Sequence, residues 1–270
     1  MENKSRELEV AIKAALEAGK VVFKYFEEGT EKVHKDNSEM VDVVTVADHE
    51  AEELIKKILS ENFPDHSILG EETGMLEKGS EYIWYIDPID GTANFSNRIP
   101  LFGVSIALAK NNELIAGVIH NPAARELFYA ERGKGAYLND KKIYVSKDSE
   151  RTGIFTAGTS RTKENRQFVK NLVFDLAEKV RYPRNFGSSV IELSYVARGS
   201  TEAHIVTGLR NYDFAAGALL VLEAEGKIIK FDGTPWKFPD NYFIASNGVF
   251  HDLLVDEVKK QKEKISFKEI

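Results

Sequence analysis

The chain has 270 residues, of which 43% are hydrophobic, and this is enough to bury a substantial core without disulfide or metal staples. Its formal net charge of -7 argues against a general binder of nucleic-acid polymers or anionic membranes, although cations held in an acidic pocket would reverse the field for a small anionic substrate. The absence of cysteine excludes disulfides, thiolate zinc sites and a cysteine nucleophile.

Neither a targeting segment nor a membrane span is expected. The start of the chain, residues 1–20, is charged and amphipathic and lacks the apolar centre of a signal peptide. No stretch approaches the roughly 18 uncharged apolar residues of a membrane helix. We therefore expect a cytoplasmic protein that acts on a small molecule.

Two amphipathic helices are predicted near the N-terminus. Apolar residues recur at helical spacing over about residues 5–27 and again over about residues 47–62. Thr45 and Asp48 form a predicted capping box at the start of the second helix, and Pro64 ends it.

Short strands are predicted in the middle of the chain. The apolar runs at residues 67–69 and 83–86 are each followed by acidic residues, which indicates buried strands that lead into loops. Further strands are predicted at residues 103–109, 114–120 and 126–130, with turns at Asn111-Asn112 and Asn121-Pro122.

In the second half, strands alternate with helices. Strands are predicted at residues 154–157, 203–206, 227–231 and 242–245, and helices at residues 163–179, 188–198, 213–224 and 250–264. Sheets interleaved with helix pairs predict a layered αβ architecture. Segments at residues 133–135 and 147–152 indicate a seam between an N-terminal α+β half, residues 1–148, and a C-terminal α/β half, residues 149–270.

Asp87 and Asp90 stand where a surface acid is unexpected. A carboxylate at the end of a buried strand is costly unless it is paired or binds a metal, and a cation relieves the repulsion between two carboxylates that face one point. If a helix starts after Asp90, the N–H groups of Gly91 and Thr92 form an anion site. From these residues alone, an ordinary turn with an N-capping aspartate is the favoured interpretation.

Three other acidic segments can also be interpreted either as site residues or as ordinary local structure. Glu71 and Glu72 follow a short strand in what is otherwise a loop. The ordinary interpretation of Asp48 is its capping role, and that of Asp213 is a helix N-cap or a first-turn acid. The small residues after Asp213 would let its helix pack closely on a neighbour. Spacing alone does not bring these segments together.

In order and spacing, residues 42–48, 70–73, 87–95 and 212–217 resemble the four metal- and phosphate-binding motifs of the inositol monophosphatase family. This family is related to fructose-1,6-bisphosphatases and to 3'(2'),5'-bisphosphate nucleotidases. The resemblance covers essentially the whole chain. It is specific because Asp-Pro-Ile-Asp-Gly-Thr is preceded by Gly-Glu-Glu and followed by Tyr-Asp-x-Ala-Ala-Gly. It implies the α+β sugar phosphatase fold, a layered αβαβα sandwich, and a homodimer.

The resemblance also implies roles for individual residues. The implied ligands of two to three Mg²⁺ ions are Glu71, Asp87, the Ile89 carbonyl, Asp90 and Asp213. The residues implied to position and deprotonate the attacking water are Thr92, Asp48 and Glu71. Asp90 and the N–H groups of Gly91 and Thr92 would contact the substrate, and Lys35 corresponds to a basic residue near the metals.

Substrate identity is where this sequence departs from the family pattern. Inositol-specific members place a glutamate seven residues before the last metal aspartate, and counting back from Asp213 gives Val206. Arg210 either binds a second phosphate or a carboxylate of the substrate, or is a surface arginine. Ser188 and Ser189 either line the substrate side of the pocket or serve as ordinary helix caps.

The sequence thus predicts a Mg²⁺-dependent phosphomonoesterase that hydrolyses inositol 1-phosphate or similar sugar and polyol phosphates by metal-activated water. Lithium sensitivity is implied by the resemblance. The alternatives within the same chemistry are a fructose-1,6-bisphosphatase, a 3'(2'),5'-bisphosphate nucleotidase and a histidinol-phosphatase. A non-catalytic metal-binding regulatory module is the alternative from another class.

Overall fold

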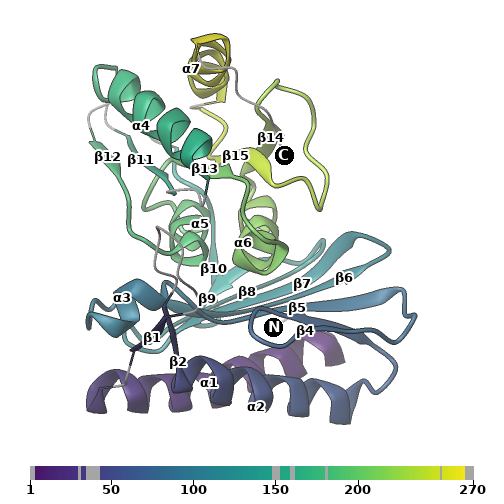
Figure 1. Ribbon diagram of the computed structural model, residues 1–270. Coiled ribbons are helices and arrows are strands. Elements are labelled where there is room, and N and C mark those ends of the chain that lie inside the picture. The colour runs from purple at the N-terminus through teal and green to yellow at the C-terminus, as the bar shows by residue number, and fades with distance from the viewer. Residues whose placement is uncertain are drawn as a thin grey trace.

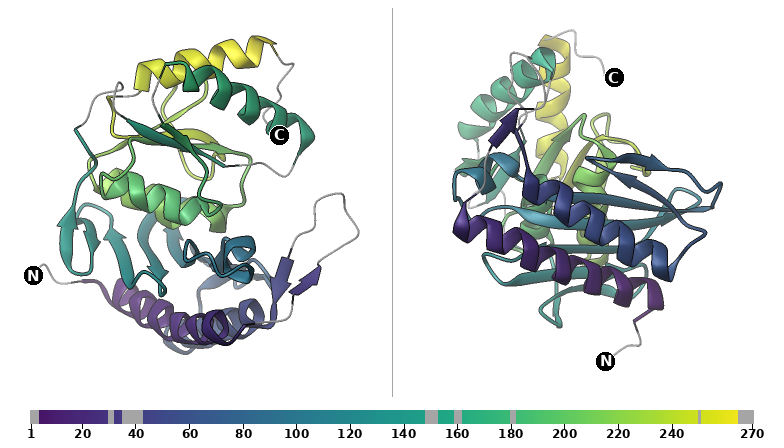
Figure 2. Two further views of the ribbon diagram at one scale, coloured as in Figure 1. Left: turned by 90° about the vertical axis from the view of Figure 1, so that its left-hand side faces the viewer. Right: turned by 60° about the horizontal axis from the view of Figure 1, so that its bottom comes forward.

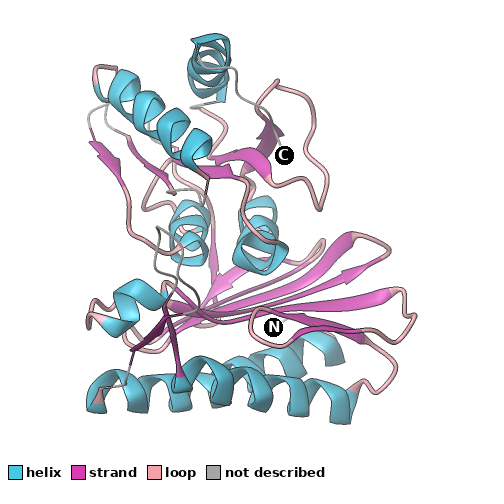
Figure 3. Ribbon diagram, in the orientation of Figure 1, coloured by secondary structure: helices cyan, strands magenta, loops and turns pink. Residues whose placement is uncertain are grey.

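Helix pairs and sheets alternate in five layers in the computed structural model, which describes residues 4–29, 32–34, 43–147, 153–158, 162–179, 182–249 and 251–264 (Figures 1 and 3). The order is α1 and α2, a large sheet, α5 and α6, a small sheet, then α4 and α7, and a side view shows the same stack (Figure 2). The helix bounds are α1 Arg6–Glu28, α2 Val46–Asn62, α3 Thr92–Ser96, α4 Lys163–Ala177, α5 Ser189–Ala197, α6 Asn211–Glu223 and α7 His251–Lys264. The predicted αβαβα sandwich is confirmed.

The large sheet is antiparallel except between β3 and β5, and its order is β10-β9-β8-β7-β6-β5-β3-β4. Its strands are β3 Ser67–Gly70, β4 Gly74–Leu76, β5 Tyr82–Asp90, β6 Gly103–Lys110, β7 Glu113–Asn121, β8 Glu126–Glu131, β9 Gly135–Leu138 and β10 Lys141–Ile143. The predicted turn between β6 and β7 is confirmed, because Asn111 and Asn112 both have positive φ, at 49° and 62°.

The small sheet has the order β12-β11-β13-β15-β14 and mixes parallel and antiparallel pairs. Its strands are β11 Ile154–Ala157, β12 Tyr182–Arg184, β13 Ala203–Thr207, β14 Lys227–Lys230 and β15 Tyr242–Ser246. Two further short strands, β1 Lys32–His34 and β2 Val43–Thr45, pair with each other.

The first helix shows how local sequence sets an element. Ser5 accepts a hydrogen bond from the Leu8 N–H at 3.2 Å, and acids in the first turn suit the helix dipole. The chain leaves the helix at Gly29, whose φ of 93° favours glycine. The buried stripe of α1 and α2 covers one face of the large sheet.

The opposite face of the large sheet is packed against α6 at very short range. A side-chain carbon on Gly117 of β7 would lie 3.1 Å from the Cα atom of Ala216. Within the same layer α6 contacts α5, where Gly217 lies against Leu193. The expected close packing of the small residues after Asp213 is therefore confirmed.

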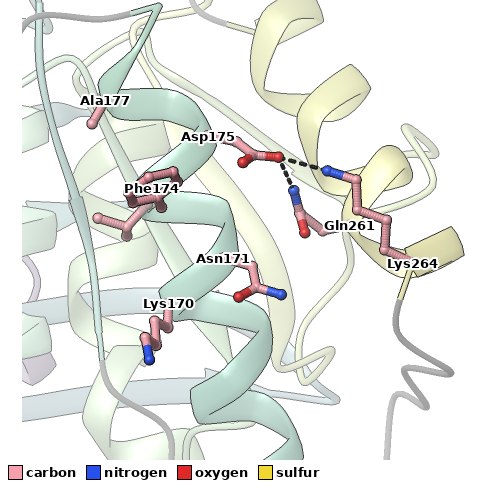
Figure 4. A pocket seen from close by; sticks show the side chains of 8 residues that line it. Lys170, Asn171, Phe174, Asp175, Ala177, Gln261 and Lys264 are labelled. Atoms are coloured by element: carbon pink, nitrogen blue, oxygen red, sulfur yellow. Dashed lines mark hydrogen bonds and ion pairs between the residues drawn. The ribbon is translucent and has the colours of Figure 1, made fainter.

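Polar contacts join α4 and α7, the outer helix pair over the small sheet. Asp175 of α4 accepts hydrogen bonds from Gln261 and from Lys264 of α7, the latter at 2.8 Å (Figure 4). None of the helices in the described ranges is both long and apolar enough to cross a membrane.

Two sequence expectations need correction. Residues 133–135 lie in the turn between β8 and β9 of one sheet, so the seam predicted there was wrong. The chain passes from the large sheet to the small one between Ile143 and Ile154, and residues 148–152 lie outside the described residues. Strands β9 and β10 were not predicted, because both are short, β10 is polar, and their joining turn, Asn139-Asp140, has no glycine. The division into halves 1–148 and 149–270 stays a prediction.

Replacing Gly217 with alanine should destabilise the packing of α5 on α6. The added carbon would lie 2.6 Å from Leu193 Cβ, so overpacking should cost about 1–3 kcal/mol despite the better helix propensity of alanine. The urea midpoint followed by circular dichroism should fall. Leu222→Ala on the exposed face of α6 should shift stability by about 0.5 kcal/mol or less, and equal effects of the two variants would contradict the packing argument.

Candidate metal site

Three aspartates from two elements meet at one point beside the large sheet. Asp87 and Asp90 belong to β5, and Asp213 lies in the first turn of α6. One carboxylate oxygen of each lies within 4.8 Å of the others. The chain segments that spacing could not bring together are therefore adjacent in the structure.

The geometry of β5 explains how two aspartates three positions apart face one point. The predicted loop after Ile86 was wrong, since β5 continues to Asp90. Asp87 pairs with Ser105 and Asp90 pairs with Gly103, so three steps on β5 oppose two on β6. Residues an odd number apart normally point to opposite faces of a strand, and the extra residue of this bulge restores the same side.

Burial makes the charges of this cluster costly. Asp87 is 1% exposed, and burial together with the nearby carboxylates of Glu71, Asp90 and Asp213 raises its pKa well above the usual range. Burial raises the pKa of Asp90 to about 6, although hydrogen bonds from Ser188 and Val190 oppose the rise. A cation at the meeting point would remove this repulsion, so the residues fit a metal site.

Glu71 reaches the cluster from the turn between β3 and β4. Its N–H donates to the Ile86 carbonyl at 3.1 Å, which continues the pairing of β3 with β5. The Glu71 carboxylate is close enough to Asp87 to raise the pKa of that aspartate by charge repulsion. The structure thus brings Glu71, Asp87, Asp90 and Asp213 together.

A helix does start after Asp90, as predicted. Gly91 is the N-cap of the five-residue helix α3, and its φ of 90° is left-handed. A side-chain carbon there would also lie 3.0 Å from the Leu101 carbonyl oxygen, so only glycine fits. The Thr92 hydroxyl donates to the Ile89 carbonyl at 3.0 Å. The predicted site groups Thr92 and the Ile89 carbonyl therefore lie together beside the cluster.

The predicted capping role of Asp48 at the start of α2 is confirmed, and only one of its two carboxylate oxygens takes part in the cap. Its Oδ2 accepts the Thr45 N–H at 2.7 Å and the Thr45 hydroxyl at 2.6 Å. Its Oδ1 is buried and has no hydrogen-bond partner. Burial raises the pKa of Asp48 to about 7, with Thr45 opposing and Glu72 adding to the rise.

Ser188 contacts the cluster directly. Its hydroxyl donates to Asp90 Oδ2, and the same oxygen accepts the Val190 N–H at 3.0 Å. Ser188 is also the N-cap of α5, and its Oγ accepts the Ile191 N–H at 3.4 Å. Ser188 therefore caps α5 and also contacts Asp90, and Ser189 is the first residue of α5, while a substrate contact of either serine stays a prediction.

Arg210 lies at the rim of the cluster. Its backbone N–H donates to Asp213 Oδ2 at 2.9 Å, so Asp213 also caps the start of α6. The Arg210 side chain is exposed and lines a cavity of about 410 Å³ that Glu71 also lines. Val206 is buried in β13 and offers the site no polar group. The predicted residue Lys35 and the motif residue Asp42 lie outside the described residues.

The sequence analysis missed two buried acids near the site. Glu52 of α2 is fully buried beneath the turn that carries Glu71. Glu192 of α5 accepts the Phe186 N–H at 2.6 Å, and burial raises its pKa to about 8. For Glu52 the usable signal was its position four residues after Asp48, which places both carboxylates on one face of a helix.

Comparisons with known proteins agree with this geometry. The model of the "Inositol monophosphatase family" matches residues 3–263. A "Fructose-1,6-bisphosphatase/inositol-1-monophosphatase" from Aquifex aeolicus is 36% identical over 97% of this chain and 99% of its own. A "Nus factor SuhB" from Pasteurella multocida is 37% identical over 88% of this chain and 90% of its own. The solved structure of a Thermotoga maritima IMPase has a TM-score of 0.88 at 32% identity and covers 96% of this chain and 99% of its own. This chain belongs to the inositol monophosphatase family.

Proposed function

We propose that this protein is a Mg²⁺-dependent phosphomonoesterase that hydrolyses small sugar or polyol phosphates, inositol 1-phosphate among them. Its family and its relatives support a phosphoric monoester hydrolase. The observation that carries the proposal is the meeting of Asp87, Asp90 and Asp213 beside the start of α3. This arrangement offers a cation site and backbone N–H donors for a phosphate side by side.

The donor set favours Mg²⁺, because every group is a carboxylate or carbonyl oxygen. Asp87, Asp90 and Asp213 would hold one ion, whereas Glu71, Asp87 and the Ile89 carbonyl would hold another. Glu71 with waters would hold a weaker third. When bound, the ions neutralise phosphate charge and lower the pKa of a coordinated water.

The chain itself supplies a proton acceptor and phosphate donors. The partnerless Oδ1 of Asp48 and a pKa of about 7 suit a group that takes a proton from water near neutral pH. With Glu71, Thr92 would hold that water once its hydroxyl turns from the Ile89 carbonyl. The first N–H groups of a helix lack intrahelical partners, so those of Gly91 and Thr92 are suited to phosphate oxygens.

Arg210 favours a substrate with a second anionic group as the alternative. Its exposed side chain faces the cavity next to Glu71, and a guanidinium binds phosphate bidentately. The Aquifex aeolicus relative carries both the fructose-bisphosphatase and inositol-phosphatase names. Fructose 1,6-bisphosphate is therefore the second candidate, with 3'(2'),5'-bisphosphate nucleotides and histidinol phosphate behind it. The relatives named Nus factor keep a non-catalytic regulatory module as a third possibility.

Other expectations rest on the family resemblance and stay predictions. They are a homodimer and sensitivity to lithium through the weakest metal site. A cytoplasmic location, expected from the sequence, also stays a prediction.

Phosphate release from a panel of substrates should depend on Mg²⁺. The panel contains inositol 1-phosphate, fructose 1,6-bisphosphate, 3'-phosphoadenosine 5'-phosphate and histidinol phosphate. Inositol 1-phosphate should be hydrolysed, and EDTA should abolish the release of phosphate measured colorimetrically. Arg210→Gln should lower kcat/KM for bisphosphates more than for the monophosphate. Inactivity on every substrate would favour the regulatory module.

Asp90→Asn should reduce kcat by about 100-fold, on the order of 3 kcal/mol of barrier, because the metal site loses a charged ligand. The rate should be measured at saturating Mg²⁺. Asp65→Asn, on an exposed loop, is the matched control and should behave like the wild type. Near-normal turnover by Asp90→Asn would refute the metal assignment.

Without metal, the protein should lose stability as the pH rises from about 4 to about 7. Asp48 and Asp90 have raised pKa values, about 7 and about 6, so the folded state holds protons that the unfolded state has already released. The loss should be on the order of 7 kcal/mol, because each pH unit between the folded and unfolded pKa of a group is worth about 1.4 kcal/mol. In EDTA the Tm should be higher near pH 5 than near pH 8, and Mg²⁺ should raise it most near pH 8. A Tm that rises with pH in EDTA would contradict this charge balance.

A further inference from the structure

Glu52 is a fully buried carboxylate in α2 with no part in the metal cluster. It accepts the Glu72 N–H at 2.9 Å and the Thr73 N–H at 2.8 Å, and it also accepts the Thr73 hydroxyl. All three donors belong to the turn between β3 and β4 that begins with Glu71. A buried carboxylate with two acceptor oxygens is matched here to three donors.

Gly70 provides the room for this contact. A side-chain carbon at Gly70 would collide with the Glu52 carboxylate, and the backbone there is not left-handed. The glycine is therefore required by close approach and not by its φ angle. Residues 70–72 and Glu52 therefore pack against each other as one unit between the large sheet and α2.

This unit fixes Glu71 from two sides. On the sheet side the Glu71 N–H donates to the Ile86 carbonyl, and on the helix side the next two N–H groups donate to Glu52. The carboxylate of Glu71 is directed toward Asp87 by this arrangement. Groups that hold a metal ligand in place typically change metal affinity by roughly 10- to 100-fold when they are altered.

We propose that Glu52 is a positioning residue that holds the turn of Glu71 so that its carboxylate reaches the metal cluster. The proposal rests on the proposed function, because it takes Glu71 as a metal ligand. Glu52 itself touches neither metal nor substrate. Glu52 also joins α2, which carries Asp48 in its first turn, to the turn that carries Glu71. The positions of Asp48 and Glu71 relative to each other are thereby fixed.

The test compares Glu52→Gln with Glu53→Gln. Glutamine keeps the size of Glu52 but directs an NH₂ group at N–H donors, which pushes the turn away. Glu53 is its neighbour, 64% exposed and paired with Lys56, so its variant is the matched control. Calorimetric titration with Mg²⁺ should show binding weakened by about 10-fold or more in Glu52→Gln and unchanged in Glu53→Gln.

A double-mutant cycle separates positioning from general loss of structure. Glu71→Gln removes the ligand, so Glu52→Gln should weaken Mg²⁺ binding no further in that background. An equal weakening in both backgrounds would mean a merely structural role and would overturn the proposal. If Glu52→Gln fails to fold, Thr73→Val removes one hydrogen bond from the other partner, and the same cycle is measured. Wild-type affinity in that variant would also overturn it.

The outcomes also separate this proposal from the proposed function. If the wild type binds Mg²⁺ but hydrolyses no phosphate ester, the hydrolase proposal fails. In that case the positioning proposal is still supported if Glu52→Gln weakens Mg²⁺ binding in the wild type and has no effect in the Glu71→Gln background. If hydrolysis is found and Glu52→Gln binds Mg²⁺ as the wild type does, only the positioning proposal fails. If the wild type binds no Mg²⁺, both fail together.

Discussion

The burial of several carboxylates at one point is the constraint on which the rest of this structure depends. Asp87, Asp90 and Asp213 lie within one another's reach, and Glu71 adds a fourth negative charge nearby. Removing such groups from water costs several kcal/mol each unless they are paired or hydrogen-bonded. The surrounding chain offsets part of this cost with N–H and hydroxyl donors, and the remaining repulsion is what a cation would relieve.

Helix capping supplies most of these donors. Asp48 accepts from Thr45 at the start of α2, and Asp213 accepts the Arg210 N–H at the start of α6. Asp90 accepts from Ser188 and from the N–H of Val190 in the first turn of α5. A carboxylate has two oxygens, so capping with Oδ2 leaves Oδ1 available to the site. The capping and metal-binding interpretations of the sequence are therefore compatible uses of the same side chain.

The parts of the fold that could be predicted are those marked by a periodic pattern or by a short apolar run. The first two helices and β11 were predicted to within a residue or two, because a buried stripe or a short apolar run fixes them. The continuation of β5 to Asp90 was missed, because proline and aspartate normally end a strand and a bulge leaves no sequence pattern of its own. Short polar edge strands such as β10 were missed for want of apolar residues.

The candidate site was predictable in composition but not in assembly. Residue types identified Asp87 and Asp90 as unusual, whereas only the family resemblance joined them to Glu71 and Asp213. Glu52 was missed because its partner is the backbone N–H of a residue 20 positions away. Almost every residue has such an N–H group, so the sequence does not show which one a carboxylate will bind. A buried acid one helical turn from a site acid is the pattern that would have indicated it.

The convergence of helix starts also explains how an acidic protein can accept an anionic substrate. Helices α5 and α6 both begin at the cluster, and each directs the positive end of its dipole there. These ends stabilise the buried carboxylates while no phosphate is present, and they attract phosphate once cations have neutralised the carboxylates. The net charge of -7 describes the whole surface, whereas binding depends on the potential inside this one site. An overall negative charge and a phosphate-ester substrate are therefore consistent with each other.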